Sequence, residues 1–177
     1  MLDIIRSQVS RVPFLRRVRR NHALEHATIH VLVQRRRPHK RLMVAGRSTD
    51  RGFFVYGAVD TAELHTAVNE ALARLRSGEH TLAVHPNCGT SLLTSAVLTS
   101  AATFAVFAGA RRLSEQFNRL PMAVFFATAA LILSQPLGLS LQRTVTTEAD
   151  MGDLKVVEVR RLMDAPIMVH WVGTVSS

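Results

Sequence analysis

The chain has 177 residues, of which 47% are hydrophobic, and a formal net charge of +9 at pH 7. This length is enough to bury one ordinary core. The positive charge suggests nucleic acid, but one Trp, one Tyr and the lack of a recognisable basic recognition module argue against that class of partner. Anionic lipid head groups explain the charge more simply, so we expect no nucleic-acid partner.

The amino-terminal part is rich in arginine and should be helical. Residues 1–12 (MLDIIRSQVSRV) have a weak basic amphipathic pattern, which is typical of a segment on a membrane surface and also of an organelle transit peptide. Pro13 suits the first turn of the next helix, expected over about residues 13–35. The arginines at 35–37 are expected at a solvated or lipid-facing helix end.

Short runs with strand-forming residues follow this helix. LMVAGRS and GFFVYG, separated by TDRG, predict a β-hairpin. Asp60 or Thr61 can cap a helix over about residues 61–77, and Gly78 can end it. TLAVHP is then expected to be a strand, and PNCGT a turn.

Two later runs, residues 91–110 and 121–141, contain no charged side chain. Each is about 20 residues long, which at ~1.5 Å per residue matches a hydrocarbon core of ~30 Å. Two buried helices of a soluble bundle are the alternative, but so small a domain has little protein to surround them. We therefore predict two membrane spans. The short polar segment RRLSEQFNR between them predicts an antiparallel hairpin with both flanking parts on one side.

After the hairpin, DLKVVEVRRL and PIMVHWVGTV predict two more strands, which can join the earlier ones in one small sheet. The predicted fold class is α+β, a small sheet-plus-helix domain with an inserted two-helix transmembrane hairpin. Residues 1–90 and 142–177 together would form one cytoplasmic domain, and residues 91–141 the hairpin.

Three features favour a multi-pass protein of the cell membrane with both termini in the cytoplasm. They are the long Arg-rich amino-terminal part, the lack of a signal peptide and the single cysteine. The positive charges decide less, because near the span ends the two sides nearly balance. The loop itself contains three of them, Arg111, Arg112 and Arg119.

Three histidines, His22, His26 and His30, recur every fourth residue in RRNHALEHATIHVL. Each such step turns a helix by only ~40° beyond a full turn, so they form one slanted row. Three apolar residues share this side of the helix, Val18, Ile29 and Val33. The row should therefore face protein, where histidines need a metal, a carboxylate or a backbone group as partner.

His22, Glu25 and His26 spell H-x-x-E-H, which resembles the inverted zinc motif of the inverzincin metallopeptidases. The resemblance implies that His22 and His26 are metal ligands and that Glu25 is the general base. The third ligand of that family is a glutamate on a later helix, and no glutamate lies near that spacing here. The resemblance therefore supports metal binding more than peptidase activity.

The motif HPNCGT places His85 and Cys88 three residues apart, a spacing by which a turn can offer two ligands to one ion. Together with His22 and His26 they would make a tetrahedral site for zinc or another divalent transition metal. Four ligands would close the site, whereas three would leave a position for water.

His30 lies too far from His22 to share one ion, since eight residues of helix span ~12 Å. It could bind a metal with His26, bind a second ion, or hydrogen-bond to a ligand. The alternative is that the row consists of satisfied core histidines and that Cys88 simply packs. Four other histidines are expected to play that structural role, His39, His65, His80 and His170.

At the level of the whole chain, NHALEHATIHVL, GFFVYG and LAVHPNCGT followed by two spans resemble an uncharacterised family of small two-span bacterial membrane proteins. This resemblance to a domain of unknown function supports the two-span architecture and the joint importance of both histidine motifs. It implies no activity.

Two functions fit these patterns. The first is a membrane-anchored zinc-binding protein that is a structural or accessory component of a larger membrane complex; the second is a membrane-tethered, zinc-dependent hydrolase with Glu25 as its catalytic residue. The expected partners are the bilayer with its anionic head groups, and other subunits or further copies that pack against the spans. Small residues in the first span would allow this close approach: Ser95, Ala96, Ser100, Ala101, Ala102, Ala105, Ala108 and Gly109.

Overall fold

The computed structural model describes residues 12–36 and 43–177. The amphipathic start of the chain up to residue 11, and His39, lie outside the described residues. Contacts divide the chain into two units, which we describe separately. The first unit comprises residues up to His85 together with Arg143–Ser177, and the second unit comprises Pro86–Gln142.

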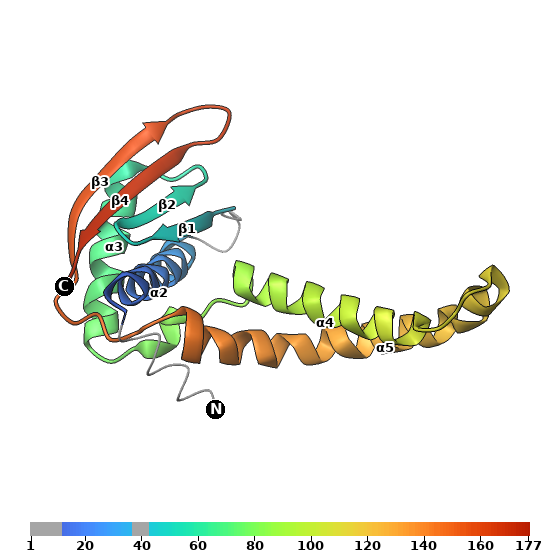
Figure 1. The fold of residues 1–177 in the computed structure, drawn as a ribbon. Coiled ribbons are helices and arrows are strands. Elements are labelled where there is room, and N and C mark those ends of the chain that lie inside the picture. The colour runs from blue at the N-terminus through green and yellow to red at the C-terminus, as the bar shows by residue number, and fades with distance from the viewer. Residues whose placement is uncertain (1–11, 37–42) are drawn as a thin grey trace. The chain divides into compact units, whose positions relative to one another are not determined.

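The first unit contains a four-stranded antiparallel sheet with the order β1-β2-β4-β3 (Figure 1). Its strands are β1 (Ala45–Thr49), β2 (Gly52–Tyr56), β3 (Lys155–Met163) and β4 (Val169–Val175). The predicted hairpin and the two late strands are confirmed, and they share one sheet as expected. β4, the last strand of the chain, occupies an inner position between β2 and β3.

Two helices cover one face of this sheet, α2 (Pro13–Arg35) and α3 (Thr61–Arg76). Pro13 stands at the first turn of α2, and the Asp60 side chain caps α3 by accepting from the backbone N–H groups of Ala62 and Glu63. The core between helices and sheet contains the fully buried apolar side chains Leu24, Leu32, Phe53, Val55, Leu64, Val68 and Val172. The mixed helix-and-sheet fold class is thereby confirmed.

The segment after α3 differs from the predicted strand TLAVHP. It forms a short 3-10 helix, η1 (His80–Ala83), followed by extended chain. Gly78 ends α3 with a φ of +97°, and Leu82 and Ala83 then turn into the core. The apolar residues of TLAVHP therefore belong to a short helical turn and not to a strand.

Arg35, at the end of α2, is exposed as expected of a solvated helix end, and Arg36 is partly exposed, whereas Arg37 lies outside the described residues. Arg35 donates to Glu70, and Arg36 donates to Glu63, so both pair with carboxylates of α3. Both ion pairs link α2 to α3 at positions that are partly open to solvent.

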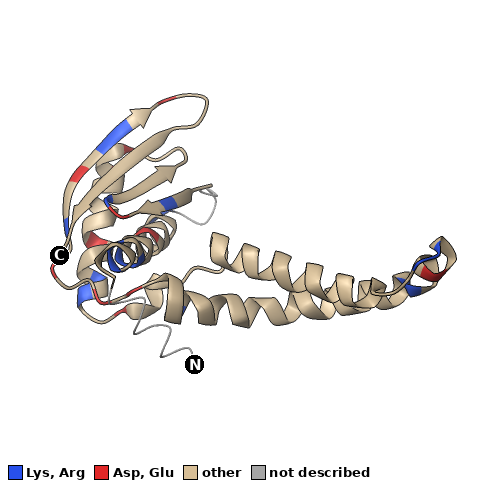
Figure 2. Ribbon diagram, viewed as in Figure 1, with Lys and Arg blue, Asp and Glu red and all other residues tan. Residues whose placement is uncertain are grey.

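The second unit contains a pair of helices, α4 (Gly89–Phe107) and α5 (Leu113–Leu141). One π-helical turn, η2 (Gln142–Thr146), begins at the last residue of this unit and continues into the part of the chain that belongs to the first unit. In the described chain, α4 and α5 are two helices long and apolar enough to cross a membrane. α5 begins eight residues before the predicted span, because Glu115 accepts from the backbone N–H of Arg111 and Arg112 and starts the helix there. Figure 2 shows that charged residues gather at the connecting loop.

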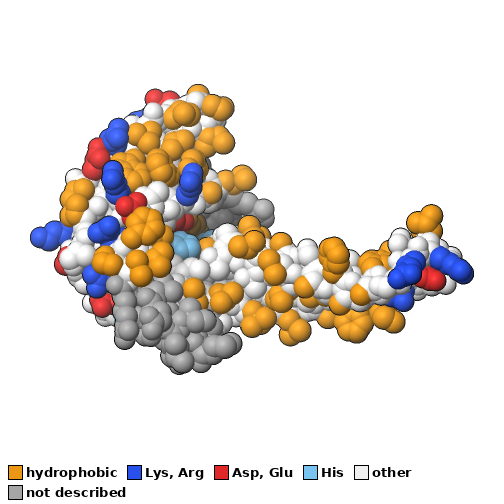
Figure 3. Space-filling model, viewed as in Figure 1, with side chains coloured by type: hydrophobic (Ala, Val, Ile, Leu, Met, Phe, Trp, Pro, Cys, Tyr) orange, Lys and Arg blue, Asp and Glu red, His pale blue; other side chains and the backbone are white. Residues whose placement is uncertain are grey.

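Polar and small side chains make the contacts between α4 and α5. The hydroxyls of Ser95 and Ser134 lie 2.6 Å apart, and Gln142 Nε2 donates to Ser91 Oγ over 2.7 Å. A Cβ atom at Gly138 would lie 2.9 Å from Ser91 Cα, so only glycine permits this approach. Apolar side chains cover the outside instead, as Figure 3 shows.

Candidate metal centre

His22 and His26 stand on successive turns of α2, and both bind a backbone carbonyl through Nδ1. His22 Nδ1 lies 3.0 Å from the oxygen of Thr146, and His26 Nδ1 lies 2.8 Å from the oxygen of Ala83. A carbonyl oxygen can only accept, so each Nδ1 carries the hydrogen and donates. In the uncharged form of each ring the lone pair is therefore on Nε2, and metal-binding histidines usually donate their other ring N–H in this way.

The two rings lie close together. Their centroids are 4.3 Å apart, and potential ligand nitrogens of the two side chains lie within 4.8 Å of each other. Two nitrogens on one tetrahedral zinc ion, each bound at ~2.0–2.1 Å, are about 3.3 Å apart. A small rotation of the side chains would thus bring His22 and His26 to the spacing of two ligands.

His85 follows η1 in the chain and lies beside the histidines of α2. Its ring centroid lies 5.8 Å from that of His26 and 5.0 Å from that of His30. Burial, and then the nearby charges that His30 and His26 would carry, lower the pKa of His85 to about 4. His85 is therefore neutral at pH 7, the form in which imidazole binds metals.

His30 is oriented differently from His22 and His26. Its Nε2 lies 2.9 Å from the carbonyl oxygen of Val84, so Nε2 carries the hydrogen and the lone pair is on Nδ1. By bonding the residue before His85, His30 fixes the segment that carries that ring. This contact suits a positioning role, one of the three that the sequence left open.

Cys88 belongs to the second unit, where it is the N-cap residue of α4. Its Sγ accepts a hydrogen bond from the backbone N–H of Thr90 over 3.4 Å. Whether this thiol shares an ion with the histidines of α2 stays a prediction. Of the other histidines expected in the core, His170 is buried and bonds to Thr61, whereas His65 and His80 are exposed, which corrects the expectation for these two.

Glu25 is buried and faces β1. Its carboxylate accepts a hydrogen bond from the Ser48 hydroxyl and fills the space beside Gly46, where any Cβ atom would overlap it. Burial raises the pKa of Glu25, although the Ser48 bond and the charge of His22 act in the opposite direction. Sequence reasoning missed Gly46 and Ser48, for which the only signal is two small residues on one side of a strand.

Buried polar residues at the start of α2 hold the segment that supplies the His22 partner. Arg19, only 3% exposed, forms an ion pair with Glu148 at 3.3 Å and donates to the carbonyl oxygen of Thr147 over 3.0 Å. Asn21 donates to the oxygen of Thr49 and accepts from Thr174. All of these contacts except that of Asn21 with Thr49 join residues more than 120 positions apart, so no local pattern in the sequence indicates them.

Residues 17–159 of the chain match the family described as a domain of unknown function, DUF6391. An uncharacterized protein of Picosynechococcus sp. is 43% identical over 103 residues, which cover 53% of this chain and 50% of the relative. The chain thus spans about half the length of the curated relative that it matches. No solved structure matches. Because the matched region covers most of the chain and includes both histidine motifs, the chain belongs to the DUF6391 family.

Proposed function

We propose that this protein is a membrane-anchored metal-binding protein, and that His22, His26 and His85 bind a divalent transition metal ion such as zinc. The observation that carries the proposal is the pair of Nδ1 bonds to carbonyl oxygens. A histidine that merely fills a core needs no particular tautomer, whereas two rings on one helix face with the same tautomer offer two Nε2 donors side by side.

The donor set suits zinc in particular. Zinc takes imidazole nitrogen and thiolate sulfur in a tetrahedral arrangement. Three neutral imidazoles supply three donors, and Cys88, three residues beyond His85 in the chain, is the proposed fourth. Such a closed site stabilises a fold and leaves no position for a reacting water.

We further propose a structural or accessory role in a larger membrane complex. In a hydrolase with this motif, Glu25 must accept a proton from water at the ion. The carboxylate instead accepts from Ser48 and packs beside Gly46, which favours a role in joining α2 to β1. The zinc-dependent hydrolase is the second candidate, since Glu25 is close enough to His22 for the charge of that ring to act on its carboxylate.

The proposed location is the cell membrane, crossed twice by α4 and α5. Their length and apolar exterior support insertion. A hairpin returns the chain to the side from which it came, so residues 1–90 and 142–177 would form one cytoplasmic domain with both termini. Anionic head groups beside it, and other subunits or a second copy packed on the small residues of α4, are the proposed partners.

Elemental analysis of protein purified without a histidine tag tests the metal proposal. His22→Ala and His26→Ala should each lose most of the bound ion, roughly 10-fold or more in affinity, because each removes one ligand. His65→Ala is the matched control, since His65 is exposed on α3 and should leave the metal content unchanged. Equal metal content in all of these proteins would refute the site. Cys88→Ser then asks separately whether the thiol is a ligand.

Glu25→Gln divides the two candidate functions. It keeps the shape of the side chain but removes the proton acceptor. For the structural role we expect lower thermal stability and no separate functional defect. A variant with unchanged metal content and stability, but without a function measured in the cell, would favour the hydrolase.

A labelling experiment tests the topology. Cysteines introduced near Glu115 should react with an impermeant thiol reagent from outside the cell, whereas those near Asp60 and Asp153 should not. The unaltered protein controls for Cys88. Reaction of all three positions from one side would exclude the hairpin.

A further inference from the structure

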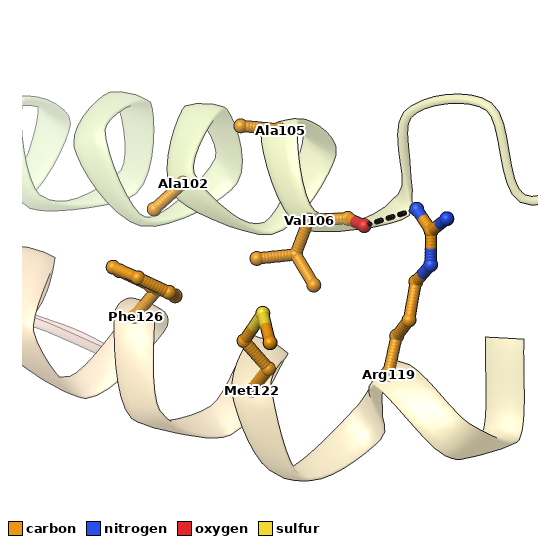
Figure 4. Close-up of a pocket in the computed structure, with 6 residues that line it drawn as sticks. All are labelled: Ala102, Ala105, Val106, Arg119, Met122 and Phe126. Atoms are coloured by element: carbon orange, nitrogen blue, oxygen red, sulfur yellow. Dashed lines mark hydrogen bonds between the residues drawn. The ribbon is translucent and has the colours of Figure 1, made fainter.

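A hollow of about 480 Å³ lies between α4 and α5 near their connecting loop (Figure 4). Its walls are entirely within the second unit. Ala102, Ala105 and Val106 come from α4, and Arg119, Met122 and Phe126 come from α5. Its volume is within the range of ~300–1,000 Å³ that is usual for small-ligand sites.

The hollow exists because α4 presents small side chains where α5 presents large ones. Figure 4 shows Ala102 pointing toward Phe126 and Val106 toward Met122. Ala102 and Ala105 contribute only methyl groups to the wall, so the side chains do not fill the space between the helices. Five of its six lining residues are apolar. Such a space takes a hydrocarbon chain and excludes a polar ligand from all but one end.

Arg119 provides that polar end. Its Nη1 donates to the carbonyl oxygens of Val106 and Ala108, each over 2.9 Å, which fixes the guanidinium at the end of α4. Its Nε and Nη2 donate to no other described residue. The planar guanidinium therefore keeps donors for an external acceptor, and its fork geometry matches phosphate oxygens.

The surrounding loop favours an anion. It contains Arg111 and Arg112 besides Arg119, against the single acidic residue Glu115. That carboxylate is already engaged, because it accepts from the backbone N–H of Arg111 and Arg112. The loop thus has an excess of positive charge beside an apolar hollow.

We propose that the hollow binds one anionic phospholipid, whose phosphate accepts hydrogen bonds from Arg119 and whose acyl chain lies against Ala102, Ala105 and Phe126. This inference rests on the proposed insertion of the hairpin into a membrane. In a bilayer the loop lies at head-group depth and the hollow faces hydrocarbon. One phospholipid can bind to Arg119 and fill the apolar hollow at the same time, because its phosphate and its acyl chain are covalently joined in that order along the membrane normal.

The full-length protein in nanodiscs tests the site, with phosphatidylcholine alone or mixed with phosphatidylglycerol as the probe. Phosphatidylglycerol should raise the melting temperature of the wild type and remain bound in native mass spectrometry. Arg119→Gln should weaken this binding roughly 10-fold or more, the loss expected for hydrogen bonds to a charged group. Arg111→Gln is the matched control, since it removes the same charge from the same loop but does not line the hollow.

A second variant keeps the charge and fills the space. Ala105→Leu should also lose the response to phosphatidylglycerol, although Arg119 is unchanged. An equal response in the Arg119 and Arg111 variants would overturn the site in favour of diffuse charge. The same stabilisation by inorganic phosphate would overturn it in favour of a free anion, and an unaffected Ala105→Leu would overturn the role of the hollow.

Membrane insertion is measured separately by resistance to alkaline extraction. Extraction of the wild type would overturn the proposed function, and this inference with it. Variants that stay inserted but bind phosphatidylglycerol as the wild type does would overturn only the lipid site.

Discussion

The two units differ in the polar groups that they bury and in the apolar side chains that they expose. In the first unit, α2 buries Arg19, Asn21, Glu25 and His26. In the second, the apolar Phe104 is 81% exposed, whereas small or polar residues of α5, such as Ser134 and Gly138, are buried. One chain thus contains a helix that buries charged and polar side chains beside its apolar ones, and a helix pair with an apolar exterior surface.

The difference teaches that polarity alone does not predict burial. Arg19, Asn21 and Glu25 of α2 have specific partners on other segments, so removal of these buried groups should cost much free energy. The hydroxyl contacts between α4 and α5 join neighbours in one hairpin, and hydrogen bonds of this kind contribute little between membrane-spanning helices, which is the proposed setting of this pair. The predictions below test that ranking.

The largest effect is expected for Arg19→Met. The change keeps the volume of the side chain but leaves Glu148 without its ion pair, which should lower the free energy of unfolding by about 3–5 kcal/mol. Trp171 is the only tryptophan and lies in β4, so its fluorescence during chemical denaturation in detergent reports the first unit. Arg47→Met, at an exposed position of β1, should change the result by no more than about 0.5 kcal/mol.

Gly46→Ala should have the next largest effect. The added methyl group overlaps the Glu25 carboxylate and must displace it from Ser48, which should cost about 1–3 kcal/mol in the same assay. Gly89→Ala is the control, because a Cβ atom there meets nothing within 4 Å. Unchanged stability of Gly46→Ala would show that Glu25 does not face β1.

Ser134→Ala should have a small effect. It removes the contact with Ser95 inside the helix pair, and such contacts between spans contribute about 0.6 kcal/mol on average. Circular dichroism of the helices during thermal unfolding measures it. A loss as large as that of Arg19→Met would contradict the difference drawn between the units.

The pH dependence contributed by His170 is the subtlest test. Burial and then Arg161 lower its pKa below the ordinary value of 6.5, against the opposing charges of Asp60 and Asp164. Since the unfolded chain takes up the proton first, the contribution to stability is complete above pH 6.5 and is lost as the pH falls. His170→Gln can still bond to Thr61 but does not titrate, so its stability should depend less on pH.

This comparison requires protein from which metal has been removed by a chelator, so that the histidines of α2 contribute equally to both profiles. Urea midpoints measured by circular dichroism from pH 7.5 downward would show the two curves diverging. Parallel curves would mean that His170 takes its proton equally in both states.

Local patterns in the sequence predicted most of the fold. The helix over residues 13–35 and the Asp60 cap follow from the positions of proline and aspartate, whose backbone preferences are local. The failure at TLAVHP is equally local, because a short apolar run does not distinguish a strand from a turn of helix. The two long apolar helices were predicted from the length of their uncharged runs, because a run of about 20 apolar residues is too long for a strand or a single turn.

The candidate site was predictable only in part. The four-residue spacing placed His22, His26 and His30 on one helix face, and the sequence also singled out His85. It could not indicate that backbone oxygens of Ala83 and Thr146 would fix the tautomers, because any residue supplies a carbonyl. Arg19 was likewise invisible as a buried group, since its partners come from the opposite end of the chain.

The inner position of β4 has a consequence for synthesis. When α4 and α5 leave the ribosome, β2 still lacks its second neighbour β4, and Asn21 still lacks Thr174. The apolar helices are therefore synthesised while the amino-terminal part is still incomplete and prone to aggregation. The final strand then closes the sheet and the polar contacts of α2 together, so a chain truncated before β4 should be degraded rather than accumulate as a partial fold.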